Sequence, residues 1–194
     1  MATYLTELNG NKYAVLEPNF LAARRTGQVR AQLPLDATDF ATKPAQNGTF
    51  LKYDMGNGVV KEPGASNPEQ VKGLMLHFSV EKEYDTLRPG LNNFAVWRQV
   101  ANNAPGTPYP RLFQPHLGDT FTTDAIKIHN STGQDVTAWN ALVVGHVYQV
   151  DRYGFIDGAS GNQSSVTGVR VKLIAKTTLP DGGYAGKFEV VNVV

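Results

Sequence analysis

Histidine offers the widest range of chemistry in this chain, and its spacing limits what that chemistry can be. The four histidines are His77, His116, His129 and His146, and the two nearest in sequence are thirteen positions apart. A zinc site within one element needs ligands only a few positions apart, so the spacing predicts no local metal site. His77 and His146 lie beside apolar residues in expected strands, which favours hydrogen-bonded structural imidazoles.

A second candidate group consists of the carboxylates Glu81, Glu83 and Asp85, which are interleaved with Lys82. Alternate residues of a strand share one face, so the three carboxylates would align if a strand continues this far. Two carboxylates facing each other across a cleft are what glycoside hydrolysis requires. A solvated strand end is the simpler interpretation, and we favour it.

Other catalytic and cofactor-binding motifs do not occur in the sequence. The chain has no cysteine, no phosphate-binding glycine loop, no dinucleotide fingerprint and no Gly-x-Ser-x-Gly elbow. The loop at residues 157–162 supplies one carboxylate and lacks the EF-hand spacing for calcium. The sequence therefore predicts a protein that is not an enzyme, with no cofactor and no metal.

Aromatic residues suggest one further kind of site. Trp97 lies in an apolar run and is expected in the core, whereas Trp139 follows a polar turn and could be a surface anchor. With Tyr109 and Tyr153, Trp139 would form the stacking surface of a carbohydrate-binding module. No spacing in the sequence brings these three residues together.

Length and charge restrict the possible partners. The 194 residues suit one ordinary domain or two small ones. Lys and Arg number 18 against 17 Asp and Glu, so the basic excess needed for sequence-independent nucleic-acid binding is missing. The first ten residues lack the pattern of a signal peptide, and no stretch approaches a membrane span of about 20 apolar residues. We expect a soluble protein made in a cytoplasm, without nucleic-acid or membrane partners.

Alternation of apolar and polar residues predicts strands through most of the chain. Two hairpins are indicated by their turns: Asn57-Gly58 between residues 49–54 and 59–62, and residues 180–183 between 168–176 and 184–194. In the second hairpin, Val169, Val171 and Leu173 should point into the core. Further strands are expected at residues 74–80, 94–98, 120–123, 125–129, 147–151 and 153–157, with short helical turns at 19–28 and 68–72.

These elements predict a mainly β fold, built of small barrel or sandwich units of antiparallel strands and hairpins. Little helix is expected. We divide the chain into an N-terminal arm and irregular segment at residues 1–46, a β unit with a proline-rich connection at 47–115, and a C-terminal β-barrel-like unit at 116–194.

The arm is the candidate interaction region because prolines interrupt residues 16–46, which still carry apolar side chains and arginines. Guanidinium groups pair well with carboxylates and carbonyls at protein interfaces. We expect the arm to reach beyond the compact domain, and a chain lacking residues 1–40 to fold but to bind its partner weakly. The predicted interface residues are Phe20, Arg24, Arg25, Arg30, Leu33 and Phe40.

Several short motifs resemble a known family of structural proteins. They are residues 47–54 (NGTFLKYD), 84–85 (YD), 88–91 (RPGL), 118–123 (GDTFTT) and 176–182 (KTTLPDG). Their order resembles the capsid decoration, or cement, proteins of tailed bacteriophages that infect Gram-positive hosts. The resemblance covers roughly residues 47–181, and residues 16–46 have no counterpart in it.

The resemblance implies a protein on the surface of the virion that binds the outside of the capsid and bridges neighbouring capsomers. Its implied partners are the major capsid protein and other copies of the same chain. A carbohydrate- or receptor-binding module of a phage tail or fibre is the main alternative. A β-rich hydrolase is a third possibility, and it would require a deep polar pocket with converging carboxylates.

Overall fold

The computed structural model describes residues 3–10, 12–16, 28–64, 73–79, 109–128, 136–158 and 168–193. Several predictions lie outside these ranges and stay predictions. They concern most of the helical turn at 19–28, the turn at 68–72, the strand at 94–98 with Trp97, the acidic group at 81–85, and the residues His129, Phe20, Arg24 and Arg25.

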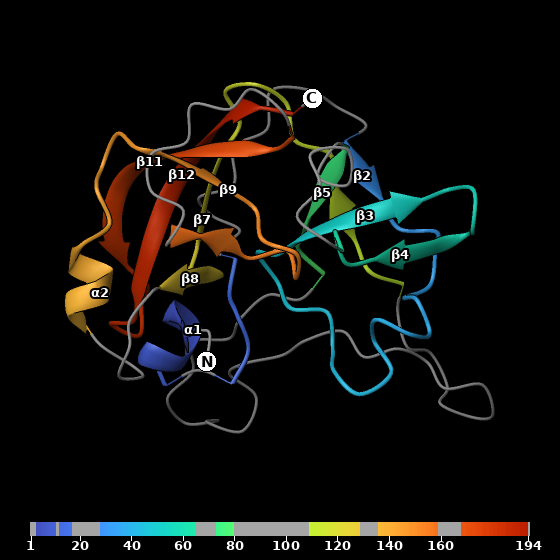
Figure 1. Cartoon of the computed structure of the whole chain (residues 1–194), viewed down its shortest axis with the longest axis horizontal. Helices are drawn as coiled ribbons and strands as arrows, with labels where there is room; N and C mark the ends of the chain where they lie inside the picture. Colours follow the sequence, from blue (N-terminus) through green and yellow to red (C-terminus); the bar gives the residue numbers. More distant parts are fainter. Residues whose placement is uncertain are drawn as a thin grey trace.

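The described chain is mainly β, as predicted, with several antiparallel sheets and two short helices (Figure 1). The sheets pack in layers like those of a sandwich, and the described residues form no closed barrel. In chain order the elements are β1 (Thr3–Tyr4), α1 (Leu5–Leu8), β2 (Val29–Arg30), β3 (Phe50–Asp54), β4 (Val59–Lys61), β5 (Leu74–His77), β6 (Leu112–Phe113), β7 (Thr120–Thr123), β8 (Ile126–Ile128), α2 (Val136–Asn140), β9 (Val147–Gln149), β10 (Ile156–Asp157), β11 (Arg170–Thr178) and β12 (Tyr184–Asn192).

One lobe is built around the long terminal hairpin of β11 and β12, which belongs to a four-stranded sheet ordered β7-β12-β11-β9. The predicted turn is present: Gly182 has a φ of 84°, and the Leu179 amide donates to the Gly183 carbonyl at 2.7 Å. A smaller sheet, β1-β8-β10, lies beside it in the same lobe (Figure 1). Both predicted hairpins are therefore confirmed.

The alternation in β11 has the predicted orientation. Val169, Val171 and Leu173 are fully buried in the main hydrophobic cluster, while Lys172 is half-buried on the opposite face. Replacing Val171 with Ala should lower the free energy of unfolding by about 1–3 kcal/mol, through lost burial and a residual cavity. Chemical denaturation would measure this loss, and an unchanged midpoint would contradict the packing.

The second lobe is a five-stranded sheet ordered β2-β6-β5-β3-β4, and its central strand β5 is buried on both faces. Leu74 and Leu76 of β5 enter the main cluster, which also holds residues of β11 and β12. Met75, between them, enters a second cluster with Leu51 of β3. Burial on both faces explains why β5 reads as a continuous apolar run rather than an alternating one. The main cluster also joins residues from the 47–115 and 116–194 parts of the chain.

The outer face of this sheet is covered by part of the predicted arm. Leu35, Phe40 and Ala45 are buried in the second cluster. Leu35 also forms a parallel bridge with Val60, where the Asp36 amide donates to the Val60 carbonyl at 2.8 Å. Leu35, Phe40 and Ala45 thus cover the chain's own sheet instead of extending to a neighbour, whereas Val29 and Arg30 stay exposed, and for them the contact with a neighbour stays a prediction. Prolines interrupt strands in this part of the chain, yet the three buried side chains still fill the core.

Several described residues of the N-terminal segment also belong to the core. Leu5 and Leu16 lie in the main cluster, and Val15 packs with Leu179 and Ala185. Asn9 is held by two hydrogen bonds to Tyr184, one from its own Nδ2 to the Tyr184 carbonyl at 2.7 Å and one from the Tyr184 amide to its Oδ1 at 2.6 Å. The N-terminal segment is therefore fixed against the turn of the terminal hairpin.

Candidate functional site

The predicted interface residues have three different environments. Phe20, Arg24 and Arg25 lie outside the described residues. Phe40 is buried in the second cluster, so its predicted interface role is wrong, because the chain's own sheet takes up its apolar surface. Leu33 is half-buried against the same cluster, and its interface role stays a prediction.

Arg30 is exposed, and it lies beside a shallow hollow on the second lobe. Its guanidinium stands over the ring of Tyr53, 5.6 Å from the centroid. Val29 is 50% exposed and Met55 is 66% exposed. We call this feature the Arg30 surface, which is lined by Val29, Arg30, Ala31, Gln32, Tyr53 and Met55. Met, Arg and Tyr are the residue types enriched at protein interfaces.

Sequence reasoning missed Met55, although a signal was present. Met55 begins the tight turn between β3 and β4, next to Gly56-Asn57-Gly58. A side chain at the tip of a two-strand hairpin has little core within reach. A large apolar residue there was therefore a candidate for an exposed contact.

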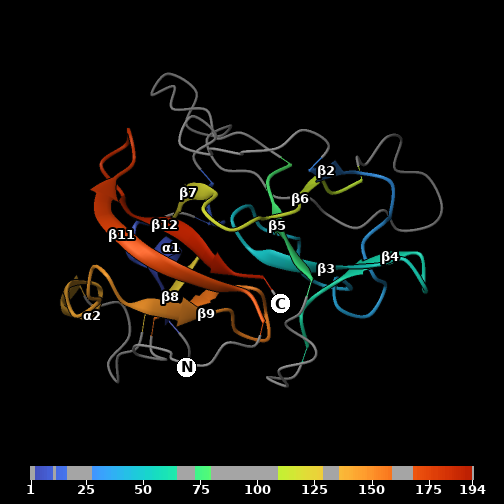
Figure 2. The same ribbon diagram turned by 90° about the horizontal axis from the view of Figure 1, so that it is seen from above.

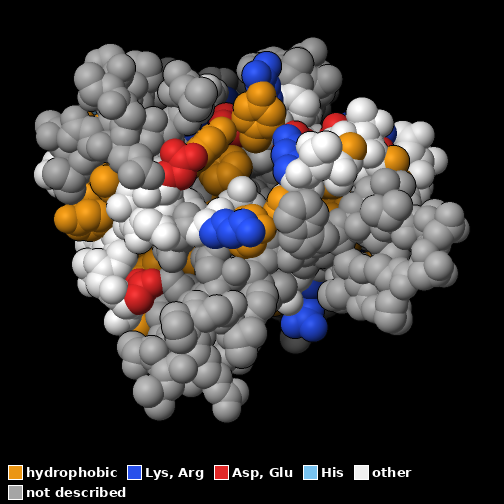
Figure 3. Space-filling model, turned by 90° about the horizontal axis from the view of Figure 1, so that it is seen from below, with side chains coloured by type: hydrophobic (Ala, Val, Ile, Leu, Met, Phe, Trp, Pro, Cys, Tyr) orange, Lys and Arg blue, Asp and Glu red, His pale blue; other side chains and the backbone are white. Residues whose placement is uncertain are grey.

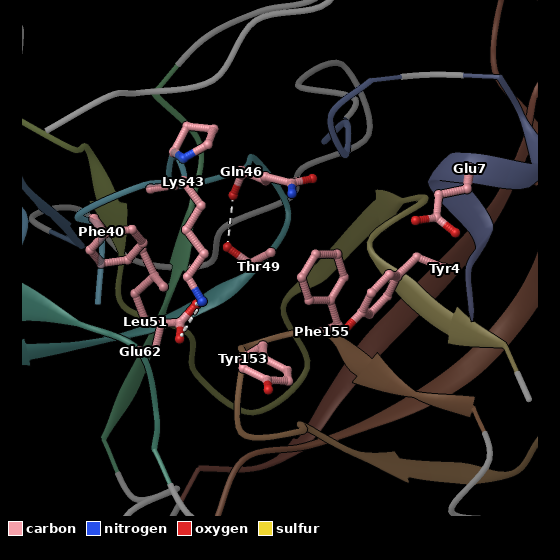
Figure 4. Close-up of a pocket in the computed structure, with 12 residues that line it drawn as sticks. Tyr4, Glu7, Phe40, Lys43, Gln46, Thr49, Leu51, Glu62, Tyr153 and Phe155 are labelled. Carbon is pink, nitrogen blue, oxygen red and sulfur yellow. Dashed lines mark hydrogen bonds and ion pairs between the residues drawn. The ribbon is translucent and has the colours of Figure 1, made fainter. Parts of the chain in front are cut away.

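A second feature is a pocket of about 210 Å³ between three segments that are distant in sequence (Figure 4). One wall comes from β1 and α1, another from residues 40–51 with Glu62, and the third from the turn between β9 and β10. The lining residues are Tyr4, Glu7, Phe40, Lys43, Pro44, Ala45, Gln46, Thr49, Leu51, Glu62, Tyr153 and Phe155. None of the short motifs in the sequence indicated this pocket.

Asp151 shapes the wall that carries Tyr153 and Phe155. Its Oδ1 accepts hydrogen bonds from the amides of both residues, each at 2.9 Å. Between them Gly154 has a φ of 90°, and its carbonyl accepts the Phe50 amide at 2.7 Å. A Cβ at this position would overlap the Phe50 carbonyl oxygen, so only glycine fits. The turn is thereby fixed against β3, with both aromatic rings lining the pocket (Figure 4).

The opposite wall is formed by the loop at residues 36–49, which is joined to the end of β4. Asp39 Oδ2 accepts the Glu62 amide at 3.1 Å, which joins this loop to the end of β4. Lys43 Nζ then lies 2.8 Å from a Glu62 carboxylate oxygen and 4.8 Å from the centroid of the Tyr153 ring. Figure 4 shows the lysine reaching from its loop to this carboxylate. In this ion pair the charges of Lys43 and Glu62 neutralise each other on this side of the pocket.

Acidic groups outnumber basic ones around the pocket, and burial strengthens their effect. Burial raises the pKa of Glu62, with Asp39 and Asp151 adding repulsion against the bonds from Lys43. Burial likewise raises the pKa of Asp151 above its ordinary value. The Tyr4 hydroxyl has a raised pKa because of burial and the nearby charges of Asp151 and other acids. The pocket therefore disfavours an additional negative charge.

His77 is the one predicted histidine site that the structure explains in full. Its side chain is completely buried, and burial lowers its pKa to about 4. Nδ1 lies 2.8 Å from the Gln46 carbonyl, which only accepts, so Nδ1 carries the proton and Nε2 accepts from the Ser79 hydroxyl at 2.6 Å. Ser79 Oγ in turn accepts the Arg111 amide at 2.6 Å. The prediction of a hydrogen-bonded structural histidine in a strand is confirmed for His77. His146 instead lies just before β9, half-buried beside the Tyr148 ring, and for it the prediction is not confirmed.

The predicted aromatic platform is not assembled. Trp139 is buried in the main cluster, so the expectation of a surface anchor is wrong. Tyr109 is exposed, whereas Tyr153 lines the pocket. The polar turn before Trp139 suggested exposure, but helix α2 places the indole against the core instead. Lys176 Nζ covers the same ring, 5.2 Å from its centroid.

Within the described ranges, no three His, Asp or Glu side chains are grouped as metal ligands. None of the helices in those ranges is long and apolar enough to cross a membrane. On the face shown in Figure 3, hydrophobic, acidic and basic side chains are interspersed, so this face carries no large patch of a single charge.

Comparison of the chain with family models, with curated proteins and with solved structures gives no match.

Proposed function

We propose that this protein is a non-enzymatic structural protein of a phage virion, which binds the outside of the capsid and bridges neighbouring capsomers. The Arg30 surface is the observation that carries the proposal, because it joins exposed apolar side chains to an arginine in a shallow hollow. The resemblance of residues 47–54, 118–123 and 176–182 to capsid decoration proteins supplies the class of partner.

Bridging requires two separate contacts, and the positions of the exposed apolar residues support this requirement. Val143 and Val144 are about half exposed in the loop that follows α2. This loop lies at one end of the long axis of the molecule, and the turn between β3 and β4 lies at the other (Figures 1 and 2). We call Val143 and Val144 the α2-loop surface. A protein with an apolar contact at each end suits a bridge between two subunits.

The stabilisation would follow from mass action. A ligand that binds only the assembled lattice stabilises it by RT ln(1 + [L]/Kd) for each site. Many copies multiply a modest contact energy, so each surface can be small. The major capsid protein and adjacent copies of this chain are the proposed partners at the two ends.

Charge substitutions at the two ends should separate binding from bridging. In co-sedimentation with undecorated capsids of tailed phages of Gram-positive hosts, Met55→Asp and Val144→Asp should each weaken binding about tenfold, since a buried unpaired charge is costly. The double variant should not bind. Each single variant should also lose the rise in capsid melting temperature that the unaltered chain confers.

The matched control is Leu117→Asp, because Leu117 is 60% exposed but belongs to neither surface. It should bind capsids as the unaltered chain does. Full affinity of the double variant, or no co-sedimentation of the unaltered chain, would overturn the proposal. Retention on a glycan array without any capsid binding would favour the carbohydrate- or receptor-binding alternative.

A further inference from the structure

We infer that the pocket of Figure 4 binds one sugar residue that carries no acidic group, a function separate from capsid binding. The pocket is formed by the N-terminal segment, the loop at residues 40–51 with Glu62, and the turn that carries Tyr153 and Phe155. Its walls combine aromatic surface with hydrogen-bonding groups of both kinds. This combination suits a ring that has apolar C–H faces and hydroxyl groups around its edge.

Two polar side chains of the lining have no hydrogen-bond partner among the residues that the structure describes. The Tyr4 hydroxyl and the Glu7 carboxylate make no hydrogen bond or ion pair with the residues that the structure describes, and both point toward the pocket in Figure 4. Glu7 accepts hydrogen bonds, while a tyrosine hydroxyl donates and accepts. Sugar hydroxyl groups complement both, because each hydroxyl does both as well.

Groups on the opposite wall are paired with one another yet keep some capacity for hydrogen bonding. Lys43 and Glu62 form an ion pair, and a neutral ligand can contact this pair without breaking it. Gln46 uses its side-chain oxygen to accept the Ala14 amide at 2.8 Å, which leaves its NH₂ group as a donor. A hydroxylated ligand thus meets hydrogen-bond donors and acceptors on both sides of the pocket.

Charge excludes acidic sugars and other anions. Glu7 and Glu62 against Lys43 give the lining a net negative charge, and half-buried Asp151, outside the lining, adds a further carboxylate close to Tyr4. An anion would also have to compete with Glu62 for Lys43. A purely cationic ligand would leave the donor groups of Gln46 and Tyr4 without acceptors, which carries a desolvation cost.

The size of the pocket limits the ligand to a single ring. Its volume of about 210 Å³ equals the space of roughly seven waters in the liquid, each of which takes about 30 Å³. Drug-sized ligands need pockets of about 300–1,000 Å³. One sugar ring at the end of a longer glycan therefore fits, with the rest of the chain in solvent.

The test is saturation-transfer NMR on the full chain with a panel of single sugars. The panel contains glucose, galactose, mannose, N-acetylglucosamine and glucosamine, with glucuronic acid as the acidic match to glucose and tetramethylammonium as a cation without hydroxyl groups. At least one sugar without an acidic group should bind. Tyr4→Phe and Glu7→Gln should each raise its Kd about tenfold, as expected for a lost hydrogen bond to a partly buried or charged group.

Tyr109→Phe is the matched control, because Tyr109 is exposed and does not line the pocket. It should leave the Kd unchanged. The inference is wrong if no sugar binds, if glucuronic acid binds as tightly as glucose, if tetramethylammonium binds in their place, or if the Tyr4 and Glu7 variants bind normally. Both pocket variants should still co-sediment with capsids, so failure of this inference and failure of the proposed function are distinguishable.

Discussion

Deleting residues 1–16 should prevent the protein from folding. Leu5, Val15 and Leu16 are buried, and their burial contributes about 5–9 kcal/mol in total at about 1.5–3 kcal/mol for each side chain. The deletion also removes the Val15 amide, which donates to buried Asp124 at 2.6 Å. The loss approaches the whole stability of a typical domain, about 5–15 kcal/mol. Circular dichroism and an amide NMR spectrum of the truncated chain would show the outcome.

A pair of point variants keeps this prediction informative if the truncated chain is insoluble. Leu5→Ala should lower the free energy of unfolding by about 2–5 kcal/mol. Leu8→Ala, three residues further along the same helix, should cost less because Leu8 is only partly buried. A truncated chain with a native spectrum would contradict this prediction and would show that residues 1–16 are a dispensable arm.

Acidification from about pH 6.5 to pH 4 should remove about 3 kcal/mol of stability through His77. Its pKa is about 4 in the folded protein and about 6.5 in an unfolded chain. Between these values the unfolded state binds a proton that the folded state does not, so stability is fully present above pH 6.5 and falls as the pH is lowered. Each unit of difference is worth about 1.36 kcal/mol. Urea denaturation across this range would measure the change.

The variant His77→Gln isolates this contribution, because it removes the titrating group from the same position. The difference between the unaltered chain and this variant should shrink as the pH is lowered. His146→Gln is the control, since it removes a histidine that contacts Tyr148 and leaves His77 in place. The control should retain the loss of stability. If His77→Gln is too unstable to purify, NMR titration of the His77 ring serves instead, and protonation near pH 6.5 would contradict the prediction.

The hairpins could be predicted because their signals are local. Asn57-Gly58 and the turn at residues 180–183 fix the chain direction within four residues, and the alternation of β11 fixes which side faces the core. The two helices, by contrast, carry no such local signal. With four and five residues, α1 and α2 are too short to show a helical period. Their positions depend on packing against residues far away in the sequence.

The pocket could not be predicted because its walls meet only after folding. Tyr4, Glu62 and Tyr153 are separated by long stretches of sequence, and no motif links them. The covering of the second lobe by Leu35 and Phe40 was missed for a similar reason. Prolines in that segment indicated irregular backbone correctly. They carried no information on whether a neighbour or the chain's own sheet takes up the apolar side chains.

The contact between Asn9 and Tyr184 has a consequence for the order of events during synthesis. The two residues are 175 positions apart, so the ribosome completes most of the chain before the first residues can reach their final partners. At about 5–20 residues per second this delay is roughly 9–35 s. During that interval Val15 lacks Ala185, one of the two residues with which it packs in a small buried cluster. We therefore expect the N-terminal segment to reach its final position only after the terminal hairpin has been synthesised.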